Sequence, residues 1–94
     1  MLDVNNREMC VMLVDRFGKK LQLTIAMEEM SELTKEICKM LRGGGLECTE
    51  GFKEELADVL VMMEQCRLMF GISYYEINER AKNKLERAMR RSGV

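Results

Sequence analysis

Apolar residues recur every three to four positions through most of the chain, a spacing that places them on one face of an α-helix. The pattern is clearest where Met30, Leu33 and Ile37 follow one another. Leu, Met, Glu, Lys and Arg, which favour helix, supply much of the remaining sequence. The pattern predicts four helices, over residues 5–17, 21–41, 52–70 and 74–90.

Glycines separate the predicted helices. Gly18 marks a turn after the first helix, three consecutive glycines at 43–45 end the second, and Gly71 ends the third. Before the fourth helix, Ser73 is a suitable N-cap, and Glu76 three residues later completes a capping-box pattern. With 94 residues and no long linker, the sequence predicts a single all-α domain over residues 1–94.

Composition excludes several classes of function. The chain has no His, which excludes catalytic triads that use His and the usual zinc sites that contain it. Fifteen Lys and Arg against 16 Asp and Glu give a net charge of −1, so no overall field favours nucleic acid. No apolar run approaches the roughly 20 residues that a membrane span needs, and no secretory signal is visible. Four cysteines without a Cys-x-x-Cys pair predict reduced thiols in a cytoplasmic protein.

Carboxylates lie beside the apolar stripes of the second and third predicted helices. On the second helix, Glu29 and Glu32 project along the flank of the stripe, whereas Glu28 projects into water. On the third, Glu55 falls inside the apolar arc and Asp58 lies on its margin. A carboxylate on an apolar face is destabilising unless something compensates its charge.

Two interpretations of these acids remain open from their spacing. Carboxylates three residues apart share a helix face, so two such pairs on antiparallel helices can converge on one divalent cation. Mg²⁺ prefers oxygen ligands and keeps water and substrate phosphates in its shell. Alternatively, Lys or Arg neutralises the acids, or they form a solvated rim.

The fourth predicted helix carries polar and basic residues next to a narrow apolar stripe. They fall within a sector of about 100°: Arg80, Asn83, Lys84, Arg87 and Arg91. Arg suits bidentate phosphate contacts, and Lys supplies a compact positive charge. The alternative is a solvated face whose residues pair with Glu79 and Glu86.

The acidic pattern resembles that of a known family. The strings Glu-Glu-Met-Ser-Glu-Leu at 28–33 and Glu-Glu-Leu-Ala-Asp-Val-Leu at 54–60 are similar to the paired acidic motifs of MazG-like nucleotide pyrophosphohydrolases. The last helix resembles the basic segment that contacts substrate phosphates in that family. The resemblance covers about residues 21–87.

This resemblance implies an Mg²⁺-dependent enzyme, with Mn²⁺ as a substitute ion, that cleaves nucleoside triphosphates between the α and β phosphates. The products are a monophosphate and pyrophosphate. The implied catalytic metal ligands are four carboxylates: Glu29, Glu32, Glu55 and Asp58. The implied phosphate contacts are on the fourth helix: Arg80, Asn83, Lys84 and Arg87. The implied fold is a helical hairpin or four-helix bundle assembled through oligomerisation.

Other functions stay open. A phosphoribosyl-ATP pyrophosphohydrolase shares the acidic motif but often carries a Tyr-His pair after it, where this chain has Val61 and Met62. A non-catalytic helical interaction module, or a relative that binds nucleotide without cleaving it, fits the same faces. Apolar residues surround much of the first predicted helix, which predicts a homo-oligomer, a dimer or tetramer, with the site near a subunit interface.

Overall fold

The computed structural model describes residues 2–93 and is all-α, as the sequence predicts. Four helices follow one another along the chain: α1 Val4–Phe17, α2 Lys19–Arg42, α3 Glu50–Met69 and α4 Tyr74–Ser92. The predicted boundaries agree to within two residues. Three boundaries differ by two residues: α2 and α3 each begin two residues earlier than predicted, and α4 ends two residues later.

Local chemistry explains where the helices begin and end. Asp3, Thr49 and Ser73 cap α1, α3 and α4, each accepting a hydrogen bond from the backbone N–H three residues later. Gly18 separates α1 from α2 and has a backbone φ of 87°. Gly71 forms the turn after α3 and has a φ of 65°. Those angles favour glycine because a Cβ is strained there.

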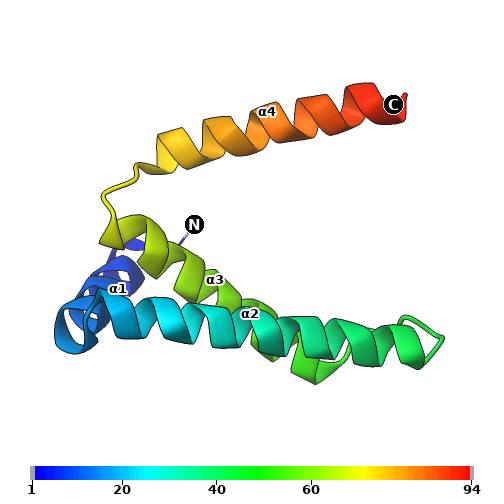
Figure 1. Ribbon diagram of the computed structural model, residues 1–94, viewed down its shortest axis with the longest axis horizontal. Coiled ribbons are helices and arrows are strands. Elements are labelled where there is room, and N and C mark those ends of the chain that lie inside the picture. Colours follow the sequence, from blue (N-terminus) through cyan, green and yellow to red (C-terminus); the bar gives the residue numbers. More distant parts are fainter. Residues whose placement is uncertain (1, 94) are drawn as a thin grey trace.

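Helices α2 and α3 form an antiparallel hairpin, and α1 packs against the same end of it (Figure 1). The apolar core is small and lies where these three helices meet: Cys10, Ala26, Val59, Met62 and Met69. Three buried polar residues accompany it, Gln22, Glu64 and Gln65. The predicted helical hairpin is therefore present.

Helix α4 lies apart from the other three (Figure 1). None of its described residues is buried, and its large apolar residues remain exposed, Leu85 by 67% and Met89 by 49%. Four helices therefore do not close into a bundle within one chain. Completion of a bundle by oligomerisation stays a prediction.

None of the described helices is both long enough and apolar enough to cross a membrane. Charged residues interrupt the apolar sequence of each of these helices within every two turns.

Candidate metal and phosphate site

Three carboxylates from the two helices of the hairpin converge. Glu29 of α2 and Glu55 and Asp58 of α3 each offer an oxygen, and these oxygens lie within 4.8 Å of one another. Glu55 and Asp58 share a face because they lie three residues apart on one helix. The antiparallel hairpin brings Glu29 to that face. Glu29 and Glu55 are half-buried, and Asp58 is exposed.

The cluster carries uncompensated negative charge. Burial, and then the charge of Asp58, raise the pKa of the Glu29 carboxyl above its usual range, and Glu55 adds to the effect. Glu55 Oε2 is buried and has no hydrogen-bond partner. A buried carboxylate oxygen without a donor, among like charges, is unfavourable unless a cation binds it.

Four basic side chains form ion pairs with acids that lie outside the cluster. Within residues 2–93 the observed ion pairs join Lys39 to Glu36, Lys53 to Glu50, Arg67 to Glu64 and Arg80 to Glu76. None of these pairs involves the three clustered carboxylates. These pairs therefore do not neutralise Glu29, Glu55 or Asp58. Cation binding by the cluster stays a prediction, and a solvated acidic rim stays the alternative.

Glu32 does not join the cluster. It lies on α2 one turn beyond Glu29 and is exposed, and no convergence with Glu55 or Asp58 is seen. Glu28 is exposed too, as predicted from its position on the side of the helix that faces away from the apolar stripe. The structure thus brings together three of the four carboxylates that the motif resemblance implies.

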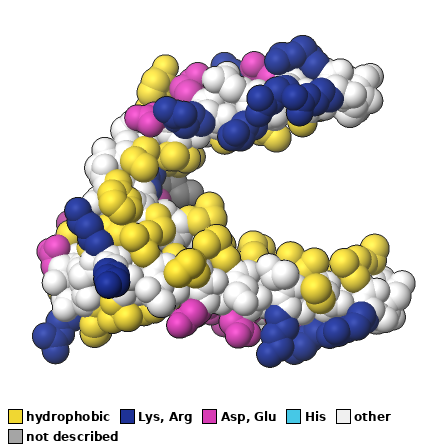
Figure 2. Space-filling view, viewed as in Figure 1, with side chains coloured by type: hydrophobic (Ala, Val, Ile, Leu, Met, Phe, Trp, Pro, Cys, Tyr) yellow, Lys and Arg dark blue, Asp and Glu magenta, His cyan; other side chains and the backbone are white. Residues whose placement is uncertain are grey.

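The predicted phosphate contacts lie together on α4. Arg80, Asn83, Lys84 and Arg87 line one open concavity of about 360 Å³, and Arg90 completes it. All are exposed, and Lys and Arg side chains gather along this helix in Figure 2. Arg80 also pairs with Glu76 at 3.3 Å. Because α4 stands away from the hairpin, this basic surface does not meet the carboxylate cluster of its own chain.

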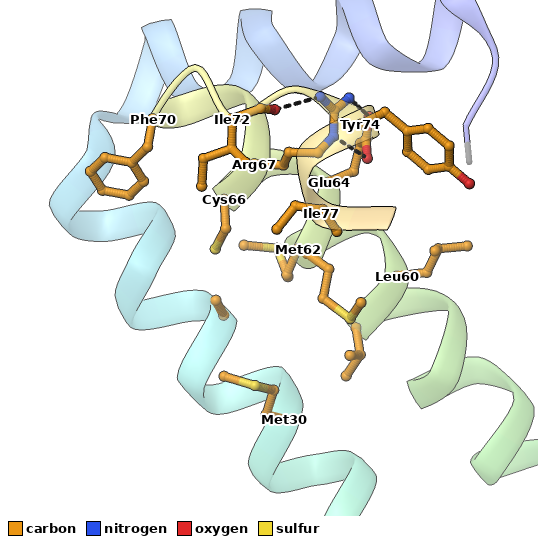
Figure 3. A pocket seen from close by; sticks show the side chains of 13 residues that line it. Met30, Leu60, Met62, Glu64, Cys66, Arg67, Phe70, Ile72, Tyr74 and Ile77 are labelled. Carbon is orange, nitrogen blue, oxygen red and sulfur yellow. Dashed lines mark hydrogen bonds and ion pairs between the residues drawn. The ribbon is translucent and has the colours of Figure 1, made fainter. Parts of the chain in front are cut away.

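A third feature was not predicted. An apolar groove of about 420 Å³ runs from Ala26 and Met30 on α2, across α3, to Tyr74 and Ile77 at the start of α4 (Figure 3). The sequence of α3 did indicate a further apolar surface, because the apolar residues cover a wider arc of this helix than one neighbouring helix can bury.

A buried ion pair closes one end of this groove. Arg67 donates two hydrogen bonds to the Glu64 carboxylate and a third, at 2.8 Å, to the Ile72 carbonyl (Figure 3). The side chains of Arg67 and Glu64 are only 12% and 9% exposed. The only sequence signal for this pair is the three-residue spacing of an acid and a base on one helix, which is too common to single it out.

Comparisons of this chain with protein-family models, with curated proteins and with solved structures find no match in any of the three. The functional argument therefore starts from the residues themselves.

Proposed function

We propose that the protein is an Mg²⁺-dependent nucleoside triphosphate pyrophosphohydrolase, which produces a monophosphate and pyrophosphate. The observation that carries this proposal is the convergence of the Glu29, Glu55 and Asp58 carboxylates. One of their oxygens, Glu55 Oε2, is buried and has no hydrogen-bond donor. The resemblance of the two acidic strings to MazG-like motifs supplies the reaction class.

Oxygen donors on two rigid helices suit a hard cation. Glu29, Glu55 and Asp58 would hold Mg²⁺, or Mn²⁺ in its place, and Glu32 one turn away would serve as a further ligand. When bound, the ion polarises phosphate oxygens and lowers the pKa of a bound water. One of these four carboxylates would orient or deprotonate that water.

The basic surface of α4 complements the polyphosphate. Arg80 and Arg87 can each make bidentate contacts with phosphate oxygens, while Lys84 adds a point charge and Asn83 a neutral donor. These side chains would orient the triphosphate and stabilise the charge on departing pyrophosphate. No residue of this surface forms a recognisable pattern for selecting one base over another.

The proposed setting is the cytoplasm. All four cysteines are unpaired, Cys10 is buried, and Cys38 and Cys48 are exposed. Exposed free thiols are compatible with a reducing compartment, where disulfides rarely form.

The test is a panel of nucleoside triphosphates assayed for pyrophosphate release with Mg²⁺, using wild type, Glu55→Gln and the matched control Glu54→Gln. Glu54 is the exposed neighbour of Glu55 and lies outside the cluster. We expect Glu55→Gln to lose about 100-fold or more in kcat/KM because the ion loses a charged ligand. Glu54→Gln should match wild type.

Two results would contradict the proposal. If Glu55→Gln retains full activity, the carboxylates do not hold the reactive ion. If wild type releases no pyrophosphate yet melts at a higher temperature with Mg²⁺ and nucleotide, the protein binds nucleotide without cleaving it. An interaction module would show neither activity nor this stabilisation.

A further inference from the structure

Glycine at position 51 lets α2 and α3 approach closely near the loop at 43–49 that joins them. Gly51 is the second residue of α3, and the Glu36 carboxylate of α2 lies against it. A Cβ at position 51 would lie 2.7 Å from Glu36 Oε2 and 2.9 Å from Glu36 Cδ. Nonbonded carbon atoms prefer roughly 3.5–4.0 Å. The Glu36 carboxylate therefore occupies space that a side chain at position 51 would need.

This position is favourable for a carboxylate. Because Cβ atoms of a helix tilt toward its N-terminus, the Glu36 carboxylate lies at the first turn of α3, the positive end of the helix dipole. Lys39, three residues later on α2, donates a hydrogen bond to Glu36 Oε1 at 3.1 Å. The side chain of Glu36 is only 15% exposed. These contacts hold the carboxylate against Gly51.

The contact belongs to the same register as the carboxylate cluster. The two helices of the hairpin are antiparallel (Figure 1), so a pairing of position 36 with position 51 puts position 29 opposite position 58. The structure agrees, because oxygens of Glu29 and Asp58 lie within 4.8 Å of each other. The Glu36–Gly51 contact and the cluster are thus two helical turns apart along one seam.

Little else fixes the register between the cluster and the loop. None of residues 30–58 is buried, and the buried residues of α2 and α3 all lie on the far side of the carboxylates from the loop. The loop contains three glycines, whose backbone freedom restrains the two helices weakly. The Glu36–Gly51 contact therefore holds together a part of the hairpin that has no buried core.

We infer that Glu36 and Gly51 are positioning residues for the carboxylate cluster. Their contact sets the position of α3 along α2, and thereby the distance of Glu55 and Asp58 from Glu29. Glu36 itself lies outside the cluster. The inference rests on the proposed function for the ion that the cluster binds, whereas the positioning depends only on the contact and the register.

The first test is Mg²⁺ affinity, measured by calorimetric titration at a temperature where circular dichroism shows every variant to be folded. Gly51→Ala adds one methyl group, which displaces the Glu36 carboxylate, improves helix propensity and leaves every charge in place. We expect the affinity to fall about tenfold without a loss in the metal-free energy of unfolding. A purely structural role would lower stability and leave the affinity of the folded protein unchanged.

Gly45→Ala is the matched control. It makes the same chemical change in the loop, where a Cβ would lie 3.8 Å from Glu47 Cγ, an ordinary contact distance. We expect this variant to bind Mg²⁺ as tightly as wild type. An equal loss of affinity in Gly45→Ala and Gly51→Ala overturns the inference.

A double variant tests whether the two residues act through one contact. Glu36→Ala removes the carboxylate and should also weaken Mg²⁺ binding about tenfold. In Glu36→Ala/Gly51→Ala the new methyl group enters space that the carboxylate has left, so the affinity should fall no further than in either single variant. Losses that multiply would show that the two residues act independently, which overturns the inference.

The second test needs no metal. Burial and the charge of Asp58 raise the pKa of the Glu29 carboxyl. Because Gly51→Ala lets the carboxylates move apart, we expect this pKa to fall toward the ordinary value of about 4.3 in an NMR titration of Glu29. Gly45→Ala should keep the wild-type pKa. An unchanged pKa of Glu29 in Gly51→Ala overturns the inference.

The outcomes distinguish this inference from the proposed function. A wild type that binds Mg²⁺, together with a Gly51→Ala variant that binds it equally tightly, overturns the positioning role and leaves the reaction standing. A wild type that binds no Mg²⁺ overturns the proposed function, and the pKa of Glu29 in Gly51→Ala still decides whether the contact positions the carboxylates.

Discussion

At the scale of single residues, burial and neighbouring negative charge both disfavour the ionised form of the Glu29 carboxyl. It is half-buried beside Glu55 and Asp58, and burial followed by the charge of Asp58 raises its pKa. A carboxyl with a raised pKa in the folded state binds protons more tightly there than in the unfolded chain. Without metal it therefore lowers stability above its raised pKa, and this penalty disappears as the pH falls.

Glu29→Gln removes that penalty. Without metal at pH 7, we expect the variant to melt at a higher temperature than wild type, because a neutral amide is not repelled by Asp58. The difference should shrink as the pH falls towards the ordinary pKa of a glutamate carboxyl, about 4.3, and vanish below it, where the wild-type carboxyl is protonated in both states.

Thermal melts from pH 4 to pH 8 with and without Mg²⁺ measure both effects. Added Mg²⁺ should raise the melting temperature of wild type and leave Glu29→Gln nearly unchanged, since the variant lacks one ligand. A variant that melts below wild type at every pH without metal would contradict the electrostatic account.

At the scale of elements, α4 depends on features at its two ends. Ser73 Oγ accepts the Glu76 N–H at 3.1 Å, and Gly93, in a left-handed conformation, caps the other end. Arg67 fixes the connector before it. Isolated helices of this length are marginal in water, so these ends matter for where α4 begins and where it points.

Arg67→Met tests the connector. The substitution leaves the buried Glu64 carboxylate without its partner and the Ile72 carbonyl without its donor, so we expect a loss of about 3–5 kcal/mol in the free energy of unfolding. Urea unfolding measures this loss. The double variant Glu64→Met/Arg67→Met removes both charges and should recover most of it. Equal losses for both variants would show that the unpaired charge is not the cause.

At the scale of the whole molecule, three helices form the core and the fourth extends from it. The radius of gyration of 15.8 Å reflects this open shape. Stability of an assembly that folds and associates together depends on protein concentration by mass action. A self-contained monomer shows no such dependence.

The melting temperature of wild type should therefore rise over about a hundredfold increase in protein concentration. Leu85→Lys should melt at one temperature throughout, because it removes the association and leaves the core of α1, α2 and α3 untouched. Scanning calorimetry at two concentrations measures the shift. A wild-type melting temperature that does not move would show that the α4 surfaces stay unpaired in solution.

The sequence by itself determined the elements of this protein. Helix periodicity, the glycines at positions 18, 43 and 71 and the Ser73 cap are local signals, because each acts within one or two turns of chain. Periodicity also determined that Glu55 and Asp58 share one face of a helix. These predictions needed no knowledge of which helix packs on which.

Only the tertiary structure decided how those faces meet. It joins Glu29 to the pair on α3 and leaves Glu32 in solvent, since the position of each side chain depends on how two whole helices pack. It also buries Glu64 with Arg67 and directs α4 away from the hairpin. Packing and the burial of charge depend on residues far apart in the chain, which no helix-period pattern encodes.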